Sequence, residues 1–220
     1  MSYWLEGSRL QNLLLLMTDG LKTTLQIFFV TLALSIPLGW PVAFARMSRR
    51  RWLSIPASFF ILIMRGTPLM LQLFAVYFFL PSVGIVVPRL TATYIAFGLN
   101  YAAYFAEIYR GGLSSIPMGQ REAARVLGIG RGKTFLHILL PQTFKRVLLP
   151  VSNEVITLVK DTSLSTVIAV PEMFIAAKNA TSASGSIFPL FVAGLFFLLM
   201  NSLVTMGFSR LVRRFDYYQG

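Results

Sequence analysis

Apolar stretches without charge alternate along this chain with short clusters of arginine. The two longest lie between Lys22 and Arg46 and between Lys178 and Arg210, and each is long enough to cross the roughly 30 Å hydrocarbon core of a bilayer. Their apolar residues form continuous blocks, whereas a helix at the surface of a soluble domain has a single apolar stripe. The pattern therefore predicts a membrane protein.

The pattern predicts an all-α membrane protein with five transmembrane helices. The expected spans are residues 20–46, 55–80, 88–112, 137–158 and 187–211. In the second span, Gly66-Thr67-Pro68 is expected to break regular helix geometry. The fourth is the least apolar, because it contains Pro150 and Glu154, but without it the basic segments would lie on opposite sides of the membrane.

The parts of the chain outside the spans are short. Residues 1–19 lack the basic start and the cleavage site of a signal peptide, and we expect them to form an amphipathic helix at the membrane interface. Residues 20–213 form the transmembrane domain, and residues 214–220 form a C-terminal tail.

Charge gives the orientation. The net charge of +12 is compatible with a nucleic-acid ligand, but the basic residues gather at the ends of spans and in one loop, so we expect a lipid surface and no nucleic acid as the partner. The positive-inside rule places these clusters in the cytoplasm, the N-terminus outside and the C-terminus inside. The chain has no cysteine, which excludes disulfides and thiolate metal sites.

An odd number of spans without an internal repeat predicts a second subunit. Five helices of one chain do not close around a polar path, so a second copy, identical or paralogous, must supply the other wall. We therefore expect a dimer with its two-fold axis along the membrane normal.

The loop at residues 115–141 is expected to carry a short cytoplasmic helix. Pro117 favours a helix start, Glu122 and Arg125 are spaced as a surface pair, and Gly128 favours the end of the helix. Small and apolar residues on this helix suit a partner that approaches closely: Ile116, Ala123, Ala124, Val126 and Leu127. An ordinary connecting loop explains the same features, and these residues alone leave that alternative open.

A family resemblance distinguishes a helix that docks on a partner from an ordinary connecting loop. The order Glu122-Ala123-Ala124, Gly128, Ile138 and Leu140-Pro141 resembles the EAA loop of ATP-binding-cassette (ABC) importer permeases. Segments 65–69, 107–112 and 160–164 resemble the polar amino acid branch of those permeases, and the resemblance extends over residues 18–213.

The resemblance implies the type I ABC importer permease fold and a bacterial inner-membrane location. It implies that the loop helix is a coupling helix, which docks on a cytoplasmic ABC ATPase dimer through Glu122, Ala123, Ala124, Arg125, Leu127 and Gly128. ATP and magnesium would bind to the ATPase, so we expect this chain to bind no cofactor and to catalyse no reaction. An extracellular or periplasmic amino acid-binding protein would deliver the substrate.

Polar residues inside the spans are candidates for the substrate path. They are Thr67, Met70, Gln72, Asn100, Tyr104, Glu107, Asp161 and Ser163. A carboxylate at membrane depth costs on the order of 3 kcal/mol, so it needs a partner or water. For Glu107 both an ion pair with Arg110 and a contact with substrate are open, and for Asp161 both a salt bridge with Lys160 and a substrate contact are open.

The expected function is ATP-driven import of polar amino acids by alternating access. Basic ones such as arginine, histidine or lysine fit the carboxylates, and glutamine is a further candidate. One alternative is a gradient-driven secondary transporter or channel, in which Glu107, Glu154 and Asp161 relay ions. Another is a membrane scaffold that does not transport and recruits a cytosolic protein through the basic loop.

Overall fold

The computed structural model describes residues 7–215, which form helices and no strand. The helices are α1 (Gly7–Arg46), α2 (Arg51–Gly66), α3 (Leu69–Phe74), α4 (Leu80–Ser82), α5 (Arg89–Ser114), α6 (Met118–Val126), α7 (Arg131–Lys133), α8 (Leu140–Asp161), α9 (Met173–Ser184) and α10 (Phe188–Phe215). Two π-helical segments, Ala75–Phe79 and Thr134–Leu139, and a 3₁₀ segment, Thr162–Ile168, adjoin them. The expectation of an all-α fold is confirmed.

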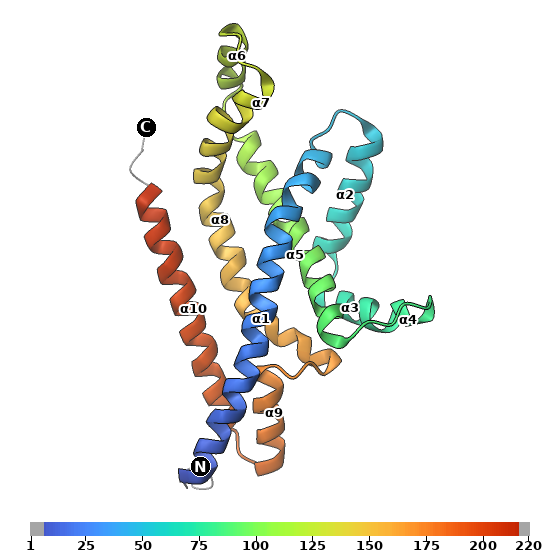
Figure 1. Ribbon diagram of the computed structural model, residues 1–220, viewed down its shortest axis with the longest axis vertical. Helices are drawn as coiled ribbons and strands as arrows, with labels where there is room; N and C mark the ends of the chain where they lie inside the picture. The colour runs from blue at the N-terminus through green and yellow to red at the C-terminus, as the bar shows by residue number, and fades with distance from the viewer. Residues whose placement is uncertain (1–6, 216–220) are drawn as a thin grey trace.

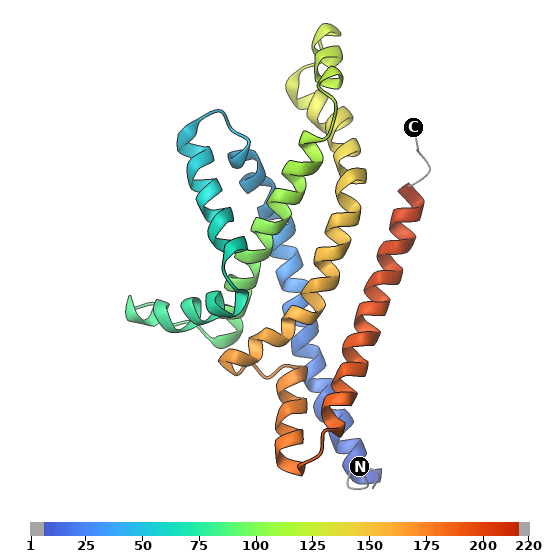
Figure 2. The same cartoon turned by 180° about the vertical axis from the view of Figure 1, so that it is seen from behind.

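The long helices run between two ends of the molecule (Figure 1). α5 packs along α1, α2 contacts both, and α8 lies between α5 and α10. The α1–α2 loop, the projecting helix α6 and the last turns of α10 lie at one end, whereas the start of α1 and α9 lie at the other (Figures 1 and 2). The three basic segments therefore share one end, as their charge predicted.

Four of the expected spans correspond to single helices, namely α1, α5, α8 and α10. Leu10–Arg46 and Phe188–Phe215 are long and apolar enough to cross a bilayer, as judged by length and composition. α1 continues without a break through residues 7–19, so these residues belong to the same helix as the first span. Their position at the membrane interface stays a prediction, and residues 1–6 and 216–220 of the two terminal segments lie outside the described part of the chain.

The second expected span, residues 55–80, is not one helix. α2 ends at Gly66, and the chain then turns by 109° into the α3–α4 segment. Thr67 is extended, as residues before proline usually are, and Pro68 has no N–H with which to continue the helix. The break in helix geometry that Gly66, Thr67 and Pro68 predicted within this span is therefore confirmed.

Two amides stabilise this break. Gln72 Nε2 donates to Met64 O at 3.0 Å and to Thr67 Oγ1 at 2.9 Å. Asn100 Nδ2 of α5 donates to Met64 O at 2.8 Å and to Gln72 Oε1 at 3.0 Å. Because lipid supplies no hydrogen bonds, these side chains satisfy carbonyl groups that the interrupted helix leaves free.

Helix α9 was not among the predicted elements. Its N-cap, Glu172, is fully buried and accepts hydrogen bonds from Phe174 N at 2.7 Å and Ile175 N at 2.6 Å. Glutamate is not among the usual N-cap residues, which are serine, threonine, aspartate and asparagine, and the segment is too short and too polar to be detected as a span. α9 packs on α1 and α10 near the end of the molecule opposite α6 (Figure 1).

We expect Gly20→Val to destabilise the contact between α1 and α9. A Cβ atom at Gly20 would lie 2.7 Å from Met173 Cα. This distance is shorter than a van der Waals contact, and the clash is with backbone, which cannot move aside as a flexible side chain can. Overpacking of this kind costs about 1–3 kcal/mol. The midpoint of thermal unfolding of the purified protein should fall by several degrees.

The matched control is Gly194→Val in α10, where a Cβ atom has no neighbour within 4 Å. Both substitutions replace glycine with valine inside a helix, so they change the intrinsic helix propensity by the same amount. Equal midpoints for the two variants would contradict close packing at Gly20.

Candidate functional site

Three neighbouring cavities form a polar route along α2, α5 and α8. The carboxylate cavity, of about 390 Å³, contains Glu154 and Asp161; the central cavity, of about 430 Å³, contains Arg65 and Glu154; the arginine cavity, of about 540 Å³, contains Arg46 and Arg65. Tyr104 lines all three, and Glu154 lines the first two. Because adjacent cavities share these side chains, the three follow one another from the α2–α3 break toward the end that carries the basic segments.

The carboxylate cavity is negatively charged. Glu154 and Asp161 are seven residues apart on α8, so two helical turns bring them to the same face. Tyr101 Oη donates to Asp161 Oδ2 at 2.8 Å, whereas Glu154 has no hydrogen bond or ion pair among the described residues. Among the described residues, no lysine or arginine lines this cavity. Its two carboxylates are therefore suited to bind a cation.

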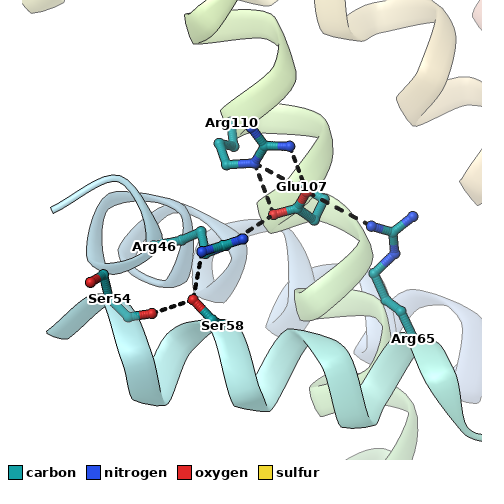
Figure 3. Close-up of polar contacts among 6 residues, drawn as sticks. All are labelled: Arg46, Ser54, Ser58, Arg65, Glu107 and Arg110. Carbon is teal, nitrogen blue, oxygen red and sulfur yellow. Dashed lines mark hydrogen bonds and ion pairs between the residues drawn. The ribbon is translucent and has the colours of Figure 1, made fainter. Parts of the chain in front are cut away.

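The arginine cluster, Arg46, Arg65 and Arg110 around Glu107, lies farther along the route (Figure 3). Arg110 holds the carboxylate with three hydrogen bonds of 2.7–3.1 Å, while Arg46 and Arg65 approach it only to 3.9 Å. Arg46 Nη1 also donates to Ser58 Oγ at 2.6 Å. The cluster thus connects α1, α2 and α5. Of the two interpretations of Glu107, the ion pair with Arg110 is present, and a substrate contact stays a prediction.

The structure brings together part of the predicted substrate path. Thr67, Asn100, Tyr104 and Asp161 meet at the carboxylate cavity, and Glu107 lines the other two. The remaining three predicted residues, Met70, Gln72 and Ser163, line none of the three cavities. Gln72 stabilises the helix break, and Ser163 Oγ donates to Lys160 O at 2.7 Å.

Several residues that line the route were missing from the predicted site, among them Tyr101, Arg65 and Glu154. Tyr101 and Arg65 were not considered, and Glu154 was considered only as an ion relay. The spacing between Glu154 and Asp161 was a usable signal, since residues two turns apart share a face. Arg65 had no such signal, because its neighbours in space, Glu107 and Tyr104, belong to another helix.

The predicted coupling helix is α6, which projects beyond the other helices (Figure 2). Val126 and Leu127 are 87% and 74% exposed, and Glu122, Ala123 and Arg125 are also exposed. The helix ends at Gly128, which has a φ of 69°.

Two residues of the expected docking face are not available to a partner. Ala124 and Ile116 are 2% and 4% exposed, because each packs within this chain, Ile116 beside Leu113 and Leu139. The exposed apolar surface of α6 consists instead of Met118, Val126 and Leu127. Docking through these residues stays a prediction.

A comparison with protein families identifies the chain. Residues 35–217 match the model of the family described as binding-protein-dependent transport system inner membrane components. The chain belongs to this family. Membership makes it the inner-membrane permease of an ATP-driven ABC importer and excludes a gradient-driven transporter or a scaffold as its class.

Individual relatives support the same assignment. The permease is 40% identical to an octopine transport system permease protein of Rhizobium radiobacter, over 88% of this chain and 83% of the relative. It is 38% identical to an arginine transport system permease protein of Bacillus subtilis, over 85% of this chain and 86% of the relative. A crystal structure of an amino acid ABC transporter with histidines matches it with a TM-score of 0.87 and 29% identity, over 96% of this chain and 99% of that one.

The permease has the type I importer fold, as the resemblance implied, and the second of its five expected spans is broken after α2. α5 and α8 are less apolar than α1 and α10 because they carry the charged side chains of the route. Membership of the family also implies an ATPase and a substrate-binding protein as partners.

Proposed function

We propose that this permease imports amino acids with a positively charged side chain. The observation that carries the proposal is the carboxylate cavity, where Glu154 and Asp161 lie without a lysine or arginine in the lining. A cationic amino acid has one more positive charge than a neutral one, so it gains most from two carboxylates in a medium of low dielectric constant. The names of the octopine and arginine permeases support a basic substrate.

The proposed mechanism is alternating access. ATP binding closes an ABC ATPase dimer, α6 transmits that movement to the membrane helices, and the route opens to opposite sides in turn. α6 and the basic ends of the helices would face the cytoplasm, with the N-terminus outside. A second permease copy, identical or paralogous, would complete the wall of the route. ATP and magnesium would stay on the ATPase, and this chain would perform no catalysis.

The test is uptake by proteoliposomes that contain the permease, its ATPase and the binding protein. We expect uptake of arginine, lysine or histidine to require ATP and to exceed uptake of glutamate. An ATPase variant without hydrolysis activity is the control, and it should abolish uptake.

Two results would contradict parts of the proposal. ATP-dependent uptake of neutral amino acids alone would reject the cationic substrate. Uptake that persists without the ATPase would reject the coupled mechanism.

A further inference from the structure

Arg65 differs from the other two guanidinium groups of the arginine cluster. Arg110 holds Glu107 with short hydrogen bonds, and Arg46 donates to Ser58. Arg65 Nη1 lies 3.9 Å from Glu107 Oε2 and donates no hydrogen bond to any residue in the described part of the chain (Figure 3). Its five N–H donors are therefore free to receive an acceptor.

The charges of the cluster do not balance. Three guanidinium groups surround the single carboxylate of Glu107, and Arg110 already occupies both oxygens of that carboxylate. Charge at membrane depth is costly unless it is paired or lies in a water-filled cavity. Arg65 lines both the central and the arginine cavity, so a second anion has access to it.

The central cavity also contains the complementary charge. Glu154 lines it from α8, and this carboxylate has no hydrogen bond or ion pair with another described residue. The cavity volume of about 430 Å³ lies within the range of small-molecule sites. A guanidinium group and a carboxylate that donate or accept no hydrogen bond within the described chain thus line the same cavity, and their charges are complementary to those of an amino acid backbone.

Tyr104 orients the guanidinium of Arg65. Arg65 Cζ lies 5.1 Å from the centre of the Tyr104 ring, a distance typical of a cation–π contact. This contact restricts the side chain, and a planar guanidinium group held in place binds a carboxylate through two parallel hydrogen bonds. Arg146, the other arginine of the central cavity, is less suitable because it already donates to Ser115 O.

We propose that Arg65 binds the α-carboxylate of the transported amino acid in the central cavity, while Glu154 binds its α-ammonium group. This inference rests on the proposed function and extends it. Asp161, deeper in the route, is then free for the cationic side chain. The permease would recognise the amino acid backbone as well as the side chain.

The experiment compares arginine with agmatine, which is arginine without the carboxylate. Binding of radiolabelled arginine to the permease–ATPase complex in nanodiscs, without the binding protein, is competed with unlabelled arginine or agmatine. We expect arginine to compete at least about tenfold better, because charge-assisted bidentate hydrogen bonds are among the strongest in proteins. Arg65→Gln should weaken arginine to the level of agmatine and leave agmatine unchanged.

Two variants serve as controls. Arg65→Lys retains the charge but loses the planar fork, so it should keep part of the preference for arginine. Arg49→Gln removes an exposed arginine of the α1–α2 loop that lines none of the three cavities, and it should behave like the unmodified permease. Size-exclusion profiles of all variants show whether each one is folded.

The outcomes separate the inference from the proposed function. Equal competition by arginine and agmatine in the unmodified permease, or an unchanged preference in a folded Arg65→Gln variant, would overturn the role of Arg65 and leave the cationic substrate standing. If Arg65→Gln does not fold, a reduced preference in Arg65→Lys supports the role, and full retention of the preference overturns it. Absence of both arginine binding and ATP-dependent uptake would reject the proposed function itself.

Discussion

Gly128→Val is expected to reduce ATP-dependent uptake roughly 10- to 100-fold, within the range of typical coupling free energies. Gly128 ends α6 with a φ of 69°, and Ile129 N donates to Ala124 O at 2.9 Å across this turn. A β-branched residue is strongly disfavoured in the left-handed region, so the end of α6 would unwind and displace the exposed Leu127. Uptake and stimulation of the ATPase by substrate-loaded binding protein are the measurements.

Gly128→Asn is the matched control. A Cβ atom at this position has no neighbour within 4 Å, so space is not the constraint. Asparagine tolerates the left-handed conformation, and this variant should keep most of the uptake. If valine and asparagine have equal effects, the backbone at Gly128 does not determine coupling.

Glu154→Gln is expected to weaken binding of arginine to the permease–ATPase complex about tenfold or more. The substitution keeps the shape of the side chain and removes its charge, and a hydrogen bond to a charged group contributes about 1.5–3 kcal/mol. Glu154 is the most informative position because it makes no hydrogen bond or ion pair with a described residue, whereas Asp161 accepts a hydrogen bond from Tyr101. Equilibrium binding of radiolabelled arginine is the measurement.

The control for Glu154→Gln is Asp19→Asn, which also removes one negative charge. Asp19 pairs with Lys22 at 2.8 Å on an exposed part of α1 and lines none of the three cavities of the route. It should leave binding unchanged. An effect of Asp19→Asn as large as that of Glu154→Gln would indicate a general influence of net charge and contradict a specific site.

The coupling helix was predictable because its signals are local. Pro117 precedes the helix, and Gly128 supplies the positive φ that a C-terminal cap requires. The burial of Ala124 was not predictable, because it depends on how the loop folds back on the rest of this chain. A sequence pattern reports which residues are small, and packing decides which of them are exposed.

The break after α2 was predictable only in part. The 66–68 segment signals an irregular backbone, yet the direction of the turn depends on Asn100, which is distant in sequence and donates to Met64 O. For the same reason Gln72 was assigned to the substrate path, whereas its amide stabilises the break. Polar residues at membrane depth serve structure or function, and their hydrogen-bond partners distinguish the two roles.

By itself the sequence determined that the protein lies in a membrane, that its basic segments cluster at one end, that a short helix projects from the loop at residues 115–141, and which family the chain resembles. These conclusions depend on hydropathy, charge and motif spacing, which are properties of residues close together in the sequence. The tertiary structure alone decided which charged groups from different helices lie together. Arg110 holds Glu107 from one turn away, while Arg65 and Glu154 come from different helices and line one cavity without a hydrogen bond to another described residue. That arrangement depends on how helices pack in three dimensions, and no local pattern contains this information.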